Sequence, residues 1–169
     1  MDKQTNSRKS EHEPRLTIQN QHFSNESNLA HYIEWDALAR ISFVNCNFEK
    51  VHLLRKVFGF CSFQNYELKY FNTRKAKSSS CQFEDCQITN CDMTGTEFYD
   101  TSFTNSNFFK IDLRASDFDS CKLKITTFSQ SNLDLILVED VKVWKSKKWV
   151  EIKDFSNFEN YLDESDNEY

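Results

Sequence analysis

The most constraining feature of the sequence is a five-residue register that runs from Cys81 to Leu133 without a slip. Written in fives, the stretch reads CQFED CQITN CDMTG TEFYD TSFTN SNFFK IDLRA SDFDS CKLKI TTFSQ SNLDL. The third position of every pentad is apolar, and at an apolar fraction of 38% such a run of eleven would arise by chance about 2 times in 100,000. The first position is small or uncharged throughout. Because a period of five fits neither a helix face nor a flat strand, we interpret the stretch as an internal repeat that determines the fold.

This pattern resembles the pentapeptide-repeat family, whose members repeat A(D/N)LXX with the central residue and the small residue two before it pointing inward. The resemblance covers most of the chain. It implies that four pentads make one square coil of twenty residues, and that coils stack into a right-handed quadrilateral β-helix, an all-β solenoid with short terminal caps. Two inward and three outward positions per pentad agree with such stacking, in which backbones pair roughly 4.8 Å apart.

Counting by twenty assigns the apolar positions to the four sides of the coil. One side carries a nearly continuous column of aromatic residues that starts at Phe23. We expect this column and the small first positions to form the structural core, represented by Phe43, Phe63, Phe83, Phe103, Leu123, Cys81, Cys86 and Cys91.

The cysteines all occupy the first position of the register, at 46, 61, 81, 86, 91 and 121. A free cysteine packs as a small hydrophobic residue. Successive pentads belong to different sides of the coil and no histidine shares the register, so we expect buried, reduced thiols and no metal or other cofactor. Cys61 and Cys81 lie one turn apart, but a disulfide between them is not expected in a reducing cytosol.

Composition narrows the class of protein further. The chain has only two Gly and one Pro in 169 residues, too few for a hairpin-rich sandwich that needs a turn every ten residues or so. It has no apolar run of about 18 residues that would span a membrane. The first fifteen residues lack the apolar segment of a secretory signal. We therefore expect a cytoplasmic protein.

The ends of the chain depart from the repeat. Residues 1–15 are polar and predicted to be disordered. Residues 16–40 are predicted to form either a capping helix or an imperfect first coil, and residues 41–145 the regular β-helix. Residues 146–169 are predicted to form a C-terminal cap and an acidic tail, with a short helix over FSNFENYL because Ser156 and Glu159 have capping-box spacing. Trp144 and Trp149 are expected to lie over the open end of the last coil.

Two interruptions fall inside the repeat. Lys56 occupies a first position, where a charge needs a partner, and predicts a local bulge. Thr73 and Ser78 replace two apolar centres in a row, next to Arg74, Lys75 and Lys77. We expect a distorted coil or a protruding loop there, with Cys81 returning on register.

No catalytic motif accompanies the repeat: the sequence has no phosphate-binding glycine loop, Cys-x-x-Cys pair or nucleophile elbow. Acidic pairs such as Asp117 and Asp119 occupy outward positions, so we expect a protein that is not an enzyme. The charges are uneven, with seven bases and one acid between Lys50 and Lys77, but eight acids and two bases between Glu84 and Asp119. Stacking would turn this into a rod with a basic half and an acidic half.

Two functions follow from the resemblance. The first is a scaffold that binds a protein partner of unknown identity; the candidate contact residues are Arg74, Lys75, Lys77, Trp144, Trp149 and Phe158. The alternative is a DNA mimic that binds DNA gyrase, as in the quinolone-resistance branch of the family, with a homodimer formed through the C-terminal cap. Fourteen acids and fourteen bases between Asp36 and Lys145 disfavour mimicry along the whole rod. Nucleic-acid binding is also disfavoured, because the bases form no continuous stripe.

Overall fold

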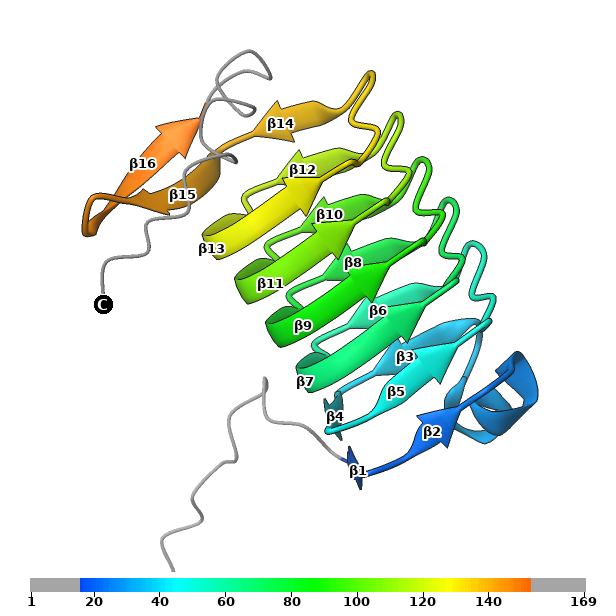
Figure 1. Cartoon of the computed structure of the whole chain (residues 1–169). Coiled ribbons are helices and arrows are strands. Elements are labelled where there is room, and N and C mark those ends of the chain that lie inside the picture. Colours follow the sequence, from blue (N-terminus) through cyan, green and yellow to red (C-terminus); the bar gives the residue numbers. More distant parts are fainter. Residues whose placement is uncertain (1–15, 153–169) are drawn as a thin grey trace, which may run out of the picture.

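The computed structural model describes residues 16–152, which wind into an all-β, four-sided helix of stacked coils (Figure 1). Strands in neighbouring coils run parallel and pair residues twenty positions apart, such as Phe43 with Phe63 and Phe83 with Phe103. The predicted quadrilateral β-helix is confirmed.

The four sides of the helix differ in how much regular strand they contain. Sides 1 and 2, centred on Phe103 and Phe108, share one sheet and side 4, centred on Phe98, forms another, whereas side 3, centred on Leu113, has isolated bridges. The first sheet contains β1 (Leu16–Gln19), β2 (His22–Phe23), β4 (Ile41–Val44), β5 (Asn47–Glu49), β7 (Ser62–Lys69), β9 (Gln82–Thr89), β11 (Ser102–Phe109), β13 (Lys122–Ser129), β15 (Val141–Lys145) and β16 (Lys148–Ile152). The second contains β3 (Ala37–Ala39), β6 (Val57–Gly59), β8 (Lys77–Ser79), β10 (Glu97–Tyr99), β12 (Asp117–Asp119) and β14 (Leu137–Glu139).

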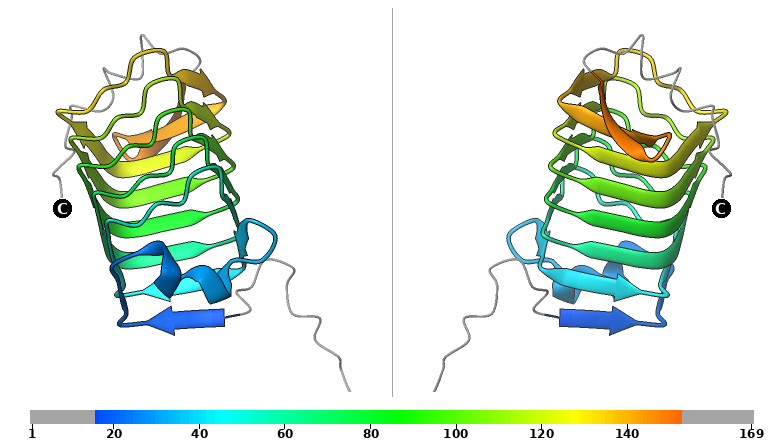
Figure 2. Two further views of the ribbon diagram at one scale, coloured as in Figure 1. Left: turned by 90° about the vertical axis from the view of Figure 1, so that its right-hand side faces the viewer. Right: turned by 90° about the vertical axis from the view of Figure 1, so that its left-hand side faces the viewer.

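Figure 2 shows the coils stacked one above another. Aromatic rings from successive coils stack in the interior. On side 1 the ring centroids are 5.1 Å apart for Phe43 and Phe63, 4.8 Å for Phe63 and Phe83, and 4.9 Å for Phe83 and Phe103. The two ring planes of each pair are nearly parallel, because in-register pairing repeats the same side-chain direction one coil later. The column is therefore a continuous apolar stack that joins the coils to one another.

The first position of the pentad has a role that the sequence analysis did not identify. Where it is Cys, Ser or Thr in a regular coil, its side chain can donate a hydrogen bond to the carbonyl of the residue 23 positions earlier: Cys61 Sγ to Leu38 O (3.3 Å), Ser116 Oγ to Met93 O (2.9 Å) and Thr126 Oγ1 to Phe103 O (3.2 Å). Cys, Ser and Thr are the small residues that can donate in this way. All six cysteines are buried and free, and they pack as small residues that also act as weak donors.

The corners of the coil depend on a left-handed backbone. Every fifth residue from 40 to 140 has a φ between 45° and 65°, and the only glycine among them is Gly95. The corner N–H bonds to a carbonyl of the next coil, as from Lys50 N to Lys69 O (3.0 Å) and from Lys75 N to Thr94 O (3.0 Å). Positive φ costs a residue other than glycine some free energy, which the inter-coil bonds and the packed core offset.

The two predicted interruptions do not distort the coil. At Lys56, β6 stays in register with β3 and β8, and the ammonium group pairs with Asp36 one coil away, so the predicted bulge is wrong. The distorted coil or loop predicted at Thr73 and Ser78 is also wrong, because both side chains are buried in a regular coil. Their hydroxyls lie 3.4 Å from Thr96 Oγ1 and 3.3 Å from Thr101 Oγ1, respectively. A cavity of about 40 Å³ in the interior is lined in part by these two residues.

Residues 16–40 form a first coil that is five residues longer than the others. Leu16 pairs with Ile41 and Phe23 with Phe48, an offset of 25, whereas Ala37 pairs with Val57 at the usual 20. The assignment of Phe23 to the side 1 column is therefore wrong: its ring stacks on Phe48 of side 2 at 4.9 Å. Two 3-10 turns, η1 (Glu26–Asn28) and η2 (Ala30–Tyr32), accommodate the extra residues and flank the fully buried Leu29.

The described C-terminal end is an antiparallel hairpin of β15 and β16, which extends side 1 by two strands. The helix predicted over 155–162 lies outside the described residues. Alternation along the hairpin buries Val141, Val143 and Ile152 and places Trp144 and Trp149 on its outer surface. The two rings thus lie beside the coils and not over the end of the interior.

Candidate functional site

The interior of the β-helix is packed, so we looked for functional side chains on its surface. The interior cavity of about 40 Å³ is too small for a metabolite. A shallow groove of about 370 Å³ follows the corner between sides 4 and 1, where Asp100 and Lys122 are its charged residues. Within residues 16–152, no three His, Cys, Asp or Glu side chains are grouped so that they could hold a metal ion.

The titratable groups inside the helix are unsuited to act as nucleophiles. Burial raises the pKa of Cys86, Cys91 and Cys121 to about 12, so these thiols stay protonated near neutral pH. Burial also raises the pKa of Tyr66, whose hydroxyl has no hydrogen-bond partner among the described residues. These groups are part of the core.

The most exposed large hydrophobic side chain among the described residues is Trp35, which is 99% accessible. It lies in a two-residue turn closed by hydrogen bonds between Glu34 and Ala37, of 2.9 Å in one direction and 2.8 Å in the other. Both turn residues have positive φ, 51° at Trp35 and 63° at Asp36, as in a type I′ turn. Asn-Gly is the usual sequence for such a turn, so backbone preference does not explain a tryptophan there.

Basic and apolar side chains surround this turn. Arg55 and Lys75 follow Trp35 at the same corner of the next two coils, and the in-register pairing of β3 with β6 places Val57 beside Asp36. All are exposed, and so is Leu54. We define the Trp35 surface as Trp35, Leu54, Arg55, Val57 and Lys75.

The structure divides the contact residues predicted from the sequence into two groups. Lys75 belongs to the Trp35 surface, and Arg74 precedes it on side 3, with its Nε 3.7 Å from Asp92. Lys77 lies on side 4 and forms an ion pair with Glu97 at 2.7 Å. Trp144 and Trp149 lie at the other end of the helix, and Phe158 is outside the described residues.

Sequence reasoning missed Trp35. Its only signal was a tryptophan at an outward corner position of an irregular pentad. Recognising it would have required the five-residue offset of the first coil.

The predicted division into a basic and an acidic half is less regular in space. Glu84 lies on side 1, Asp92 and Asp112 on side 3, and Asp117 and Asp119 on side 4. Several of the acids in this stretch are paired with bases: Asp112 with Arg114 at 2.6 Å, Glu97 with Lys77 and Asp92 with Arg74. The Arg114 guanidinium holds the pKa of Asp112 below its usual value.

Comparisons with known proteins agree with the repeat. Residues 81–119 match the family model for pentapeptide repeats (8 copies). No curated protein sequence matches the chain. Within residues 16–152, no helix is long and apolar enough to span a bilayer.

Solved structures with some similarity are also pentapeptide-repeat proteins. QnrB1, a plasmid-mediated fluoroquinolone resistance protein, is 14% identical with a TM-score of 0.30, over 75% of this chain and 69% of QnrB1. Rfr23 from the cyanobacterium Cyanothece 51142 is 13% identical with a TM-score of 0.27, over 80% and 85% of the two chains. HetL from Nostoc sp. strain PCC 7120 is 10% identical with a TM-score of 0.20, over 77% and 86%. Scores at this level carry no functional argument.

Proposed function

Since the chain is a β-helix that carries pentapeptide repeats, we propose that it is a non-catalytic scaffold that binds a protein partner through the Trp35 surface. The observation that supports this most directly is the complete exposure of Trp35 in a turn with two positive φ values. Tryptophan and arginine are enriched among residues that dominate binding energy at protein interfaces. The expected compartment remains the cytoplasm, where the six free thiols stay reduced.

The surroundings of Trp35 suit a protein partner. Leu54 and Val57 supply exposed apolar area near the turn, and the charged side chains around it are of both signs: Arg55 and Lys75 on the next coils, and Glu34 and Asp36 on either side of Trp35. The β3–β6 pairing holds the base of the turn, so little backbone entropy is lost on binding. We expect the partner to offer an apolar pocket for Trp35, with charged side chains of both signs around it.

The gyrase alternative has less support. A DNA mimic needs acids on one continuous face, whereas the acids between Glu84 and Asp119 lie on three sides and several are neutralised by ion pairs. A supercoiling assay is expected to show neither inhibition of gyrase by this chain nor protection of gyrase from a fluoroquinolone. Protection at micromolar protein would revive the alternative.

The test is affinity capture with the full chain and variants of its exposed aromatic residues. Trp35→Ala is expected to abolish capture of the specific partner and to change the free energy of unfolding by no more than about 0.5 kcal/mol. Tyr70→Ala is the matched control, because Tyr70 is another exposed aromatic corner residue, on side 2. If Trp35→Ala captures the same proteins as the unmodified chain, the Trp35 surface is not the binding site.

A further inference from the structure

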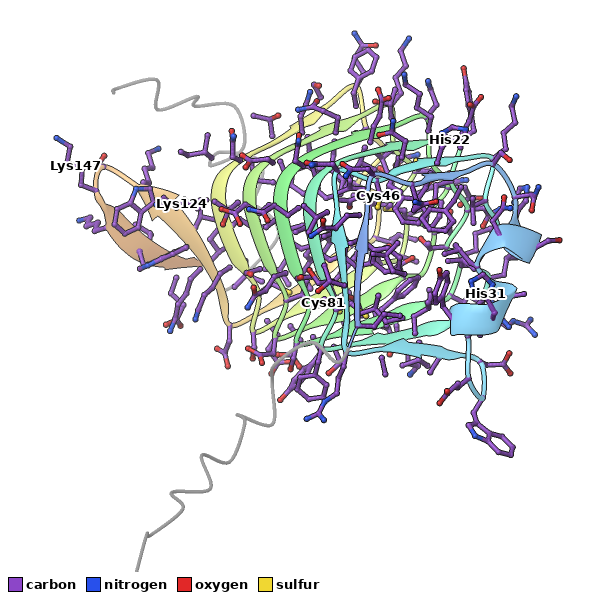
Figure 3. The ribbon with its side chains drawn as sticks, turned by 90° about the horizontal axis from the view of Figure 1, so that it is seen from below. His22, His31, Cys46, Cys81, Lys124 and Lys147 are labelled. Carbon is purple, nitrogen blue, oxygen red and sulfur yellow. The ribbon has the colours of Figure 1, made fainter. Side chains whose placement is uncertain are left out.

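A second charged surface lies on side 1 at the opposite end of the helix from Trp35. β13 and β15 pair Lys122 with Lys142, and both side chains lie on the outer face of side 1. Lys124 lies on the same side, and Lys147 is in the hairpin turn (Figure 3). Alternation along the hairpin places the Lys145–Lys148 pair on the opposite face, with Val143 and Val150. We call Lys122, Lys124, Lys142, Trp144 and Trp149 the lysine face.

The coil collects these lysines although the sequence separates them. Asp134, Glu139 and Asp140 fall between Lys124 and Lys142 in the chain, but they lie on side 3, on side 4 and at the corner that follows side 4. Glu151, paired in register with Lys142, is the acidic residue of the hairpin. Within residues 16–152, no ion pair joins Lys122 or Lys142 to an acid. Neighbouring ammonium groups repel one another, so an anion placed between them would be stabilised.

Two tryptophans lie among the lysines. Trp144 and Trp149 face each other across the hairpin, with ring centroids 5.3 Å apart and planes at 72°. The Lys124 ammonium group lies 5.2 Å from the centroid of Trp144, whereas Trp149 is 43% exposed. One aromatic ring is thus held in place by its neighbour and remains accessible to a ligand.

We propose that the lysine face binds single-stranded nucleic acid, with phosphates on Lys122, Lys124 and Lys142 and a base stacked on Trp149. Basic side chains along a surface combined with exposed aromatic rings are the usual means of binding a single strand. The basic side chains here are lysines, which act as point charges toward phosphate. We therefore expect binding to be independent of the nucleotide sequence. A membrane is a poorer fit, because anchoring to a bilayer needs more apolar area than Trp149 and Ile125 expose.

Lysines on an edge strand also prevent edge-to-edge pairing of sheets, and β16 is such a strand. A purely protective role predicts no affinity for an oligonucleotide. The two roles therefore separate in a binding measurement.

The experiment measures fluorescence anisotropy of a labelled thymidine oligonucleotide of about 20 nucleotides with the full chain. Binding is expected to weaken with salt at a log–log slope of about −2, corresponding to three phosphates on a single strand. Lys122→Glu combined with Lys142→Glu is expected to weaken binding about tenfold or more. Trp149→Ala is expected to weaken it about fivefold or more without changing the salt slope.

Matched controls keep the proposal falsifiable. Lys50→Glu combined with Lys69→Glu makes the same charge change on side 2 and is expected to change affinity less than about twofold. In a Trp35→Phe background Trp144 and Trp149 are the only tryptophans, and the oligonucleotide should quench their fluorescence. No binding, equal losses in both double variants, or equal affinity for polyglutamate would overturn the proposal. Binding to phosphatidylserine vesicles but not to the oligonucleotide would overturn it in favour of a lipid surface.

Discussion

The middle coils and the first coil show the same pentad serving two purposes. In the middle coils, residues twenty apart repeat one interior, and the side chains that vary face water. In the first coil, two 3-10 turns take up five extra residues, and a separate tight turn after them carries Trp35 outward. The difference indicates that the regular register builds the packed interior, whereas the irregular first coil carries the most exposed aromatic side chain of the described residues.

The largest expected loss of stability follows from removing a side chain from the interior of the middle coils. Phe103 is 1% exposed, stacks on Phe83 and makes edge contacts with Phe98 and Phe108. Phe103→Ala is expected to cost about 3–5 kcal/mol in urea unfolding, because it leaves a cavity between coils. Thr104→Ala, one residue along and facing outward, should cost less than about 1 kcal/mol. If Phe103→Ala and Thr104→Ala lose the same free energy of unfolding, the interior aromatic column is not the main source of stability.

A slightly smaller loss of folding stability is expected at alkaline pH, where the buried thiols oppose folding. The pKa values of Cys86, Cys91 and Cys121 are raised by burial from 9.0 to about 12, so the unfolded chain releases these protons first as the pH rises. Stability should therefore fall above about pH 9, by about 1 kcal/mol for each thiol at pH 10. Urea unfolding from pH 7 to pH 10 measures the slope, and replacing the three cysteines with alanine should flatten it. If the dependence of the unfolding free energy on pH is unchanged in that variant, the three buried thiols are not its cause.

An intermediate loss of stability is expected when the buried hydrogen-bond donor at the first position of a pentad is removed. Ser116 is fully buried, and its Oγ donates to Met93 O at 2.9 Å. Ser116→Ala leaves this carbonyl without its side-chain partner and is expected to cost about 1–2 kcal/mol. Ser116→Cys keeps a weak donor and should cost less. If cysteine costs more than alanine, volume and not hydrogen bonding governs this position.

The smallest effect is expected at Tyr66. Its hydroxyl is buried without a partner among the described residues, so the hydroxyl contributes a desolvation cost and no bond. Tyr66→Phe is expected to leave stability unchanged or raise it by up to about 1 kcal/mol. Thermal unfolding of both proteins tests this, and a clear loss of stability would show that the hydroxyl is bonded in solution.

The sequence was sufficient for the fold because apolar and small residues recur with a fixed period, and this period survives even where Thr73 and Ser78 replace the apolar centres. The sequence wrongly predicted a distorted coil at those two residues. Their hydroxyls are buried because each lies beside the hydroxyl of a residue 23 positions later, a pairing that is not visible in the local sequence. The sequence also placed Phe23 on the wrong side, because an insertion of one pentad leaves the local pattern intact. The lysine face was hidden for a related reason: residues twenty apart become neighbours only after the coil has formed.

The 25-residue offset of the first coil has a consequence for how such a chain changes its length. Adding one pentad lets Leu16 pair with Ile41 and still returns Ala37 to Val57. An insertion of five residues preserves which side chains face inward, whereas an insertion of one residue would turn every later side chain to a different direction. Viable insertions and deletions in this gene should therefore occur in multiples of fifteen nucleotides, or about one pentad at a time.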